Sequence, residues 1–161
     1  MSVNPVNKLS TPNASSPLYD SSLGSPLVSG MLVVIPHKCA GCRTCELACS
    51  FAHSIEGNFG RPRIKVYTFG EKRCIQMTCM QCVDAACAKV CSVQALIRNN
   101  STGAIEVNLE RCVGCGLCET ACPFGHMHFD REARRAVKCD LCGGKPKCAA
   151  FCPNRALEIR P

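Results

Sequence analysis

Apolar residues along this 161-residue chain are confined to short segments. Residues 31–36 are apolar and rich in β-branched side chains, and residues 64–69 alternate between apolar and polar positions, so both segments predict strands. Residues 46–53 and the Ala-rich residues 84–90 predict short helices. Further strands are predicted at residues 95–97, 104–107, 127–130, 136–138 and 156–159, with hairpin turns at 98–103 and 131–134. The pattern indicates an α+β fold built from short elements.

Cysteines occupy the loops between these segments. The chain contains 17 cysteines, and 16 of them fall into four quartets that all end in x3-C. The first and third quartets have the spacing C-x2-C-x2-C-x3-C, and the other two widen only the middle gap. The quartets are Cys39, Cys42, Cys45, Cys49; Cys79, Cys82, Cys87, Cys91; Cys112, Cys115, Cys118, Cys122; and Cys139, Cys142, Cys148, Cys152. Only Cys74 is left over, and we expect it to pack as a small buried hydrophobe.

This spacing is typical of iron–sulfur proteins, and the third quartet, followed by Pro123, matches the bacterial run C-x2-C-x2-C-x3-C-P. Three thiolates on one tight loop can hold three corners of an Fe4S4 cluster, and the fourth cysteine normally ligates the partner cluster. Zinc is the main competing metal, but zinc sites typically join two C-x2-C pairs across a long loop. The sequence therefore predicts four [4Fe-4S] clusters.

The composition agrees with a fold that is organised around metal. The chain has no Trp, six Phe and two Tyr, so it cannot build a large apolar core, and small domains of this kind usually need metals or disulfides. We expect the clusters to form the core and the chain not to fold without iron and sulfide. The formal charge of +7 treats every thiol as neutral. Four oxidised clusters with their thiolates add about −8, so the excess of Lys and Arg does not indicate nucleic-acid binding.

Two other groups of residues bear on the predicted clusters. Four basic residues either raise the potentials of nearby clusters or are ordinary solvated side chains, and the sequence leaves both interpretations open: Arg43, Lys72, Arg73 and Lys138. Four histidines could replace a cysteine ligand, as in Rieske centres: His37, His53, His126 and His128. Because every quartet is complete, we expect these histidines to be ordinary surface or loop residues.

Half of residues 1–30 are Ser, Pro or Asn, which is the composition of a segment that cannot fold alone. We interpret it either as a disordered tail or as an extended arm, and we favour an arm that packs along a neighbouring subunit. A secreted disulfide scaffold would need an export signal, and this segment has no charged region followed by an apolar one. Residues 31–35 are too few to span a membrane. We therefore expect a cytoplasmic protein that binds neither membrane nor nucleic acid.

The four quartets, the hairpin between the second and the third, and the run Cys122-Pro-Phe-Gly125 resemble a known family. It comprises the four-cluster ferredoxin-type electron-transfer subunits of molybdenum and tungsten oxidoreductases, formate-linked hydrogenases and carbon monoxide dehydrogenase. The resemblance covers residues 31–161. It implies two pseudo-symmetric halves that are like bacterial ferredoxin, an outer half from residues 31–73 and 131–161 and an inner half from residues 74–130.

In that family the first and fourth motifs share one pair of clusters, and the second and third share the other. Carried onto this chain, the resemblance implies four ligand sets: Cys39, Cys42, Cys45 with Cys152; Cys139, Cys142, Cys148 with Cys49; Cys79, Cys82, Cys87 with Cys122; and Cys112, Cys115, Cys118 with Cys91. Ser50 and Ser92 depart from the Pro of the pattern, which removes no ligand but leaves the turns after Cys49 and Cys91 less determined.

Within this family the chain looks most similar to the small subunit of cytoplasmic tungsten-containing aldehyde oxidoreductases. The resemblance rests on the short length, the missing export signal, the absence of membrane partner features and phrases such as residues 45–51, Cys-Glu-Leu-Ala-Cys-Ser-Phe. That resemblance implies that a tungsten–pterin subunit oxidises an aldehyde and that this chain passes electrons to a flavin subunit or a ferredoxin, without being an enzyme itself. A carbon monoxide dehydrogenase, a hydrogenase or a benzoyl-CoA-reductase-type complex would use the same residues. An alternative of another class is a structural protein whose clusters are redox-silent and whose arm drives polymerisation into a filament.

Overall fold

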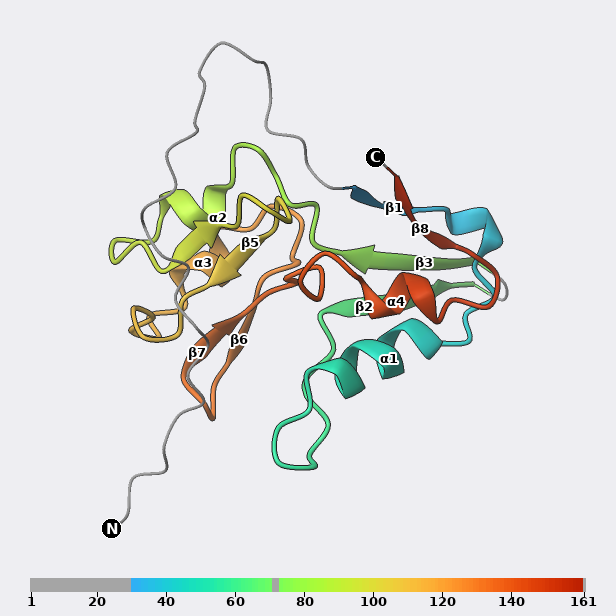
Figure 1. Ribbon diagram of the computed structural model, residues 1–161, viewed down its shortest axis with the longest axis horizontal. Helices are drawn as coiled ribbons and strands as arrows, with labels where there is room; N and C mark the ends of the chain where they lie inside the picture. Colours follow the sequence, from blue (N-terminus) through green and yellow to red (C-terminus); the bar gives the residue numbers. More distant parts are fainter. Residues whose placement is uncertain (1–29, 71–72, 161) are drawn as a thin grey trace.

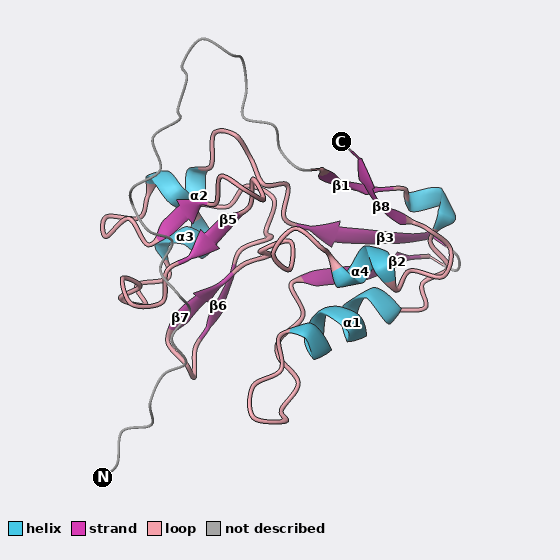
Figure 2. Cartoon of the chain, viewed as in Figure 1, coloured by secondary structure: helices cyan, strands magenta, loops and turns pink. Residues whose placement is uncertain are grey.

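Short helices and two-stranded antiparallel sheets form the computed structural model, which describes residues 30–70 and 73–160 (Figures 1 and 2). The helices are the 3-10 helix η1 (Pro36–Lys38) and the α-helices α1 (Thr44–Ala52), α2 (Ala86–Lys89), α3 (Leu117–Thr120) and α4 (Lys147–Ala150). The strands are β1 (Met31–Val34), β2 (Ile64–Phe69), β3 (Arg73–Thr78), β4 (Leu96–Arg98), β5 (Ile105–Val107), β6 (His128–Asp130), β7 (Arg135–Val137) and β8 (Leu157–Arg160). This is the α+β architecture of short elements that the sequence predicts.

Strand pairing joins the two ends of the described chain. β1 pairs with β8 in antiparallel register, so that Met31 lies opposite Arg160 and Val34 lies opposite Leu157. The remaining strands form three local pairs, β2 with β3, β4 with β5 and β6 with β7. Because β1 and β8 come from the two ends, the segments around the first and the fourth quartet are held side by side (Figure 1).

The elements gather into two groups in Figure 1. One contains the β1–β8 and β2–β3 pairs with α1 packed against α4, and the other contains the β4–β5 and β6–β7 hairpins with α2 packed against α3. The predicted boundaries at residues 73/74 and 130/131 fall inside these pairs, since β3 joins β2 and β7 joins β6. The division into an outer and an inner half stays a prediction, and the predicted arm of residues 1–30 lies almost wholly outside the described residues.

Most predicted elements are present, with small shifts at their ends. β2 has the predicted bounds, and both predicted hairpins form. α1 begins two residues earlier than predicted, and α2 is shorter because Ala85 has an extended backbone with φ −87° and ψ 105°. β3 was not predicted, since its buried residues are the polar Gln76 and Thr78 while Arg73 and Ile75 are exposed.

Cysteines and alanines make up most of the core. Of the 18 buried hydrophobic residues among those described, six are Cys and five are Ala. Large side chains lie mostly outside, and Phe51, Phe59 and Phe151 are each at least 60% exposed. Aliphatic packing alone therefore gives this fold a small core, as the composition predicts. No helix in the described part of the chain is long and apolar enough to span a bilayer.

Candidate metal centres

Each quartet begins with a turn that requires a left-handed backbone. The residue before the second cysteine has a positive φ in all four quartets: Gly41 (70°), Gln81 (49°), Gly114 (69°) and Leu141 (54°). At two of these positions glycine is also needed for space, since a Cβ at residue 41 would lie 2.7 Å from Cys74 Sγ and one at residue 114 would clash with the carbonyl oxygen of Arg134. In the first and second quartets the amide of this residue donates to the sulfur of the first cysteine at 3.4 Å.

A short helix then positions the third cysteine of each quartet. These residues are Cys45 in α1, Cys87 in α2, Cys118 in α3 and Cys148 in α4, and all four are buried. The fourth cysteine comes four residues later, which is about one helical turn. It lies within α1 in the first quartet and just beyond the helix end in the others. Only Cys45 and Cys49 therefore share one helix, where residues four apart lie on the same side.

Three cavities are each lined by four cysteines that come from two different quartets. The first is lined by Cys39, Cys42, Cys45 and Cys152. The second is lined by Cys79, Cys82, Cys87 and Cys122. The third is lined by Cys112, Cys115, Cys118 and Cys91. In every case the loop supplies three cysteines and the end of another quartet supplies the fourth.

The remaining four cysteines lie close together as well. Burial raises the pKa of Cys148, and the neighbouring thiolates of Cys139, Cys49 and Cys142 raise it further. Cys49 and Cys148 belong to one buried cluster, in which α1 packs on α4. All 16 quartet cysteines thus gather into four groups, and their assignment as ligands stays a prediction.

Burial of these cysteines disfavours their thiolate forms, and a bound metal cation would offset that cost. Burial is the largest cause that raises the pKa of Cys45, Cys118 and Cys139, each to about 11. Ligation by iron favours the deprotonated sulfur and removes this penalty. Gln76 is another indication, since it borders the cavity of Cys39, is 4% exposed and has an Oε1 without a hydrogen-bond partner among the described residues. A group bound in that cavity would give this buried amide a partner.

Backbone amides point at the fourth cysteine of every quartet. The amides of Arg63, Ala95 and Ala156 each donate to a sulfur at 3.2 Å, that of Cys49, Cys91 and Cys152 respectively. Burial acts to raise the pKa of Cys122, but hydrogen bonds from the amides of residues 124–127 lower it overall. Such amide dipoles stabilise negative charge on sulfur, whether it is a free thiolate or a cluster ligand.

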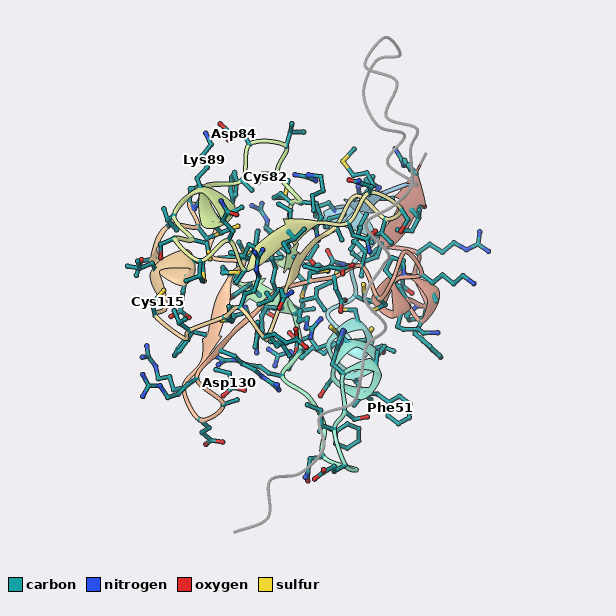
Figure 3. All side chains as sticks on the ribbon, turned by 60° about the vertical axis from the view of Figure 1, so that its left-hand side comes forward. Phe51, Cys82, Asp84, Lys89, Cys115 and Asp130 are labelled. Carbon is teal, nitrogen blue, oxygen red and sulfur yellow. The ribbon has the colours of Figure 1, made fainter. Side chains whose placement is uncertain are left out.

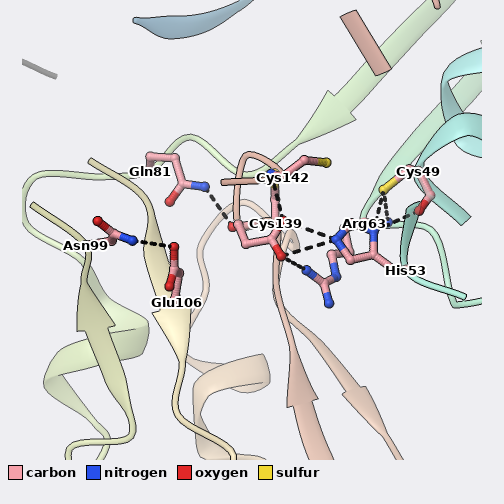
Figure 4. A network of polar contacts seen from close by, with 9 residues as sticks. Cys49, His53, Arg63, Gln81, Asn99, Glu106, Cys139 and Cys142 are labelled. Atoms are coloured by element: carbon pink, nitrogen blue, oxygen red, sulfur yellow. Dashed lines mark hydrogen bonds and ion pairs between the residues drawn. The ribbon is translucent and has the colours of Figure 1, made fainter. Parts of the chain in front are cut away.

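A charged network lies beside Cys49 (Figure 4). His53 Nδ1 lies 2.8 Å from the Cys49 carbonyl oxygen, and its Nε2 lies 3.2 Å from Asp140, which also accepts from Arg63 Nη1 at 2.5 Å. The hydrogen bond with Asp140 is the main cause that raises the pKa of His53 to about 10. Burial opposes ionisation of Asp140, yet His53 and Arg63 hold its pKa well below the usual range. His53 is therefore a charged partner of Asp140 rather than an ordinary loop histidine.

His53, Asp140 and Cys142 place potential ligand atoms within 4.8 Å of one another. This arrangement belongs to the same region as the fourth cysteine group, and both His53 and Asp140 already have partners. Of the other three histidines, His126 borders the cavity of Cys122, His128 lies in β6 and His37 lies in η1. Sequence reasoning missed Arg63 and Asp140, although Asp140 directly follows a quartet cysteine.

The four basic residues that the sequence singles out differ in burial. Arg43 and Arg73 are exposed, and Lys72 lies outside the described residues. Lys138 is only 4% exposed, and its Nζ lies 2.6 Å from Cys79 Sγ. The structure thus separates one buried cation from two solvated ones.

Cavities lined by four cysteines from two loops are typical of iron–sulfur proteins, and comparison with known families agrees. Residues 71–160 match the model of the 4Fe-4S dicluster domain, and residues 36–52 match that of a 4Fe-4S binding domain. The chain belongs to the 4Fe-4S dicluster domain family.

Several similar proteins are described as subunits or chains of enzymes. The aliphatic sulfonate oxidoreductase polyferredoxin-like subunit of Pyrococcus furiosus is 40% identical over 123 residues, covering 75% of this chain and 70% of the relative. One chain of the anaerobic dimethyl sulfoxide reductase of Haemophilus influenzae is 35% identical over 144 residues, covering 77% and 70%. Formate hydrogenlyase subunit 2 of Escherichia coli is 35% identical over 158 residues, covering 75% and 76%.

Proposed function

We propose that this chain is an electron-transfer subunit of an oxidoreductase complex and carries four [4Fe-4S] clusters. The observation that carries the proposal is the set of three cavities, each lined by four cysteines from two quartets. Each cluster, when bound, supplies a one-electron redox centre. The proposed ligands are Cys39, Cys42, Cys45, Cys152; Cys139, Cys142, Cys148, Cys49; Cys79, Cys82, Cys87, Cys122; and Cys112, Cys115, Cys118, Cys91.

The packing supports an order of these four sites along the molecule. Neighbouring sites share a buried cluster or pack against one: Cys45 with Cys148, Cys139 with Cys79, and Cys87 with Cys118. The cysteines at the two ends of this order reach the surface, since Cys42 and Cys115 are the two exposed cysteines of the 17 (Figure 3 shows Cys115 near the edge of the molecule). A carrier chain needs a partner at each end, and the exposed Cys42 and Cys115 mark where these partners would dock.

For the catalytic partner we favour a tungsten–pterin aldehyde oxidoreductase subunit, with a flavin subunit or a soluble ferredoxin as the electron acceptor. Residues 45–51 support this choice by their resemblance to the small subunit of such enzymes. The names of the relatives, which include a sulfonate oxidoreductase and a dimethyl sulfoxide reductase, support an oxidoreductase partner of some kind. Formate hydrogenlyase subunit 2 makes a hydrogenase the second candidate. The two-half division, self-association through residues 1–30 and a cytoplasmic location stay predictions.

Elemental analysis of the native complex, purified without oxygen, tests the proposal. We expect about sixteen irons per copy of this chain after those of its partners are subtracted, together with tungsten. Nickel in place of tungsten would move the partner to a hydrogenase or a carbon monoxide dehydrogenase. Zinc in place of iron, or clusters that neither reduce nor reoxidise during turnover, would overturn the electron-transfer function.

A further inference from the structure

Lys138 is a buried cation at the junction between two proposed sites. It lies between β7 and Cys139 and borders the cavity of Cys79, Cys82, Cys87 and Cys122. Its side chain is bound at its tip, where Nζ lies 2.6 Å from Cys79 Sγ and 3.0 Å from Gln81 Oε1. Burial of an ammonium group is unfavourable unless the group is paired, so these contacts fix its position.

Gln81 holds this lysine in place from a constrained position of its own. Its backbone is left-handed, with φ 49°, where the corresponding residues of the first and third quartets are glycines. The side-chain oxygen also accepts from the amide of Ile105 at 2.9 Å. Nε2 donates to the carbonyl oxygen of Cys139 at 2.8 Å (Figure 4). Gln81 thus ties the loop of the second quartet to that of the fourth, with Lys138 between them.

The charge of Lys138 is directed at sulfur rather than at an acid. None of the ion pairs among the described residues involves Lys138. Cys87 lines the same cavity as Lys138, so the lysine lies near a second sulfur of this site. Elsewhere uncharged amides contact sulfur, as in Gly41 to Cys39 and Ala95 to Cys91. The comparable charged contact is at Cys49, whose sulfur lies 3.8 Å from His53 Nδ1, against 2.6 Å between Cys79 Sγ and Lys138 Nζ.

We propose that Lys138 is a positioning residue that sets the reduction potential of the cluster held by Cys79, Cys82, Cys87 and Cys122. The inference rests on the proposed function, since it assumes those ligands. Reduction adds negative charge to a cluster, and a fixed cation in a water-poor site favours the reduced state. Lys138 therefore raises the potential of this one cluster relative to a site that has only amide donors.

The test is a redox titration, monitored by electron paramagnetic resonance, of the full chain in its native complex. The variants are Lys138→Met, which keeps the length of the side chain, and Lys138→Arg, which keeps its charge. Lys147→Met is the matched control, because Lys147 also adjoins a proposed ligand, Cys148, but is exposed. Iron content is measured for each variant.

We expect Lys138→Met to keep about sixteen irons and to lower the potential of one cluster. The reduced-to-oxidised ratio of that cluster at a fixed solution potential should fall about tenfold or more, which is about 59 mV for one electron. Lys138→Arg should keep the potential of that cluster close to its wild-type value. Lys147→Met should change the potential of every cluster by much less.

If Lys138→Met loses iron, Gln81→Glu decides the matter, since it leaves the lysine in place and sets a carboxylate beside it. The same cluster should then shift to a lower potential. Unchanged cluster potentials in Lys138→Met would overturn this inference and leave the proposed function intact. If Lys138→Met loses iron, unchanged potentials in Gln81→Glu would do the same. A wild-type complex without about sixteen irons or without reducible clusters would instead overturn the proposed function.

Discussion

The turn after the fourth cysteine is the same in three quartets and different in the first. In the turns after Cys91, Cys122 and Cys152, the third residue beyond the cysteine has a left-handed backbone, and its amide donates to the carbonyl oxygen of that cysteine. These residues are Gln94 (φ 50°), Gly125 (64°) and Arg155 (48°). The amide of the next residue then reaches the cysteine sulfur.

After Cys49 the chain does not turn, because α1 continues to Ala52. The sulfur of Cys49 instead receives the amide of Arg63, from 14 residues further along. Ser50 holds the intervening loop, since its carbonyl oxygen accepts from the amide of Gly60 at 3.0 Å and its hydroxyl donates to the carbonyl oxygen of the same residue. Asp140 then fastens both ends of the loop by pairing with His53 and Arg63.

The comparison shows that proline is not what makes this turn. Cys91 is followed by Ser92, yet its turn matches those that begin Cys122-Pro123 and Cys152-Pro153. The common feature of all four sites is an amide donated to sulfur, which the chain supplies either from a four-residue turn or from a distant loop. A hydrogen bond to the sulfur is therefore shared where the backbone path is not.

The strongest test of this equivalence is removal of the exceptional cysteine. If Cys49 is a ligand despite its different turn, Cys49→Ser should lower the iron content from about sixteen to about twelve per chain. Ser is nearly the same size as Cys but is a poor ligand for these clusters. Iron analysis and the visible absorption of the anaerobically purified complex measure the loss.

Cys74→Ser is the control, since Cys74 lies against Gly41 but belongs to no quartet. It should keep all of the iron. Equal iron in the two variants would show that the first quartet does not complete a site through Cys49.

The second test weakens the network that replaces the turn. Asp140→Asn removes the carboxylate between His53 and Arg63, whose side chains are 14% and 22% exposed. Loss of a partner from a largely buried pair should cost about 2 kcal/mol and lower the thermal midpoint of the holo-protein by roughly 4–8 °C. Differential scanning fluorimetry under argon measures the shift.

The matched control is Asp84→Asn, which removes a surface ion pair. Asp84 and Lys89 are 74% and 66% exposed and lie together at the periphery (Figure 3). An exposed pair is worth about 0–1 kcal/mol, so the midpoint should move little. Similar shifts in the two variants would show that the Asp140 network does not hold the loop.

The sequence predicts what repeats at short range and misses what joins distant residues. Cysteine spacing is local, so all four quartets could be recognised, and the alternation of residues 64–69 gave the bounds of β2. β3 was not predicted because its buried positions are the polar Gln76 and Thr78, whereas strand prediction expects apolar residues at buried positions. The pairing of His53 with Asp140, 87 positions apart, and of Gln81 with Lys138, 57 positions apart, has no signal in one sequence.

The left-handed residue of the common turn offers the smallest effect and the most direct comparison. Arg155 is exposed and holds a φ of 48°, a conformation that costs a residue with a Cβ about 1–2 kcal/mol but costs glycine little. Arg155→Gly should therefore stabilise the holo-protein by up to about 1 kcal/mol, since the added flexibility of the unfolded chain offsets part of the gain. Lys147→Gly, an exposed position in α4, should destabilise it by about 1 kcal/mol because its backbone is helical. A higher thermal midpoint in Arg155→Gly together with a lower one in Lys147→Gly would show that the left-handed backbone at residue 155 costs stability. Lower midpoints in both variants would mean that the Arg155 side chain contributes more stability than its backbone strain costs.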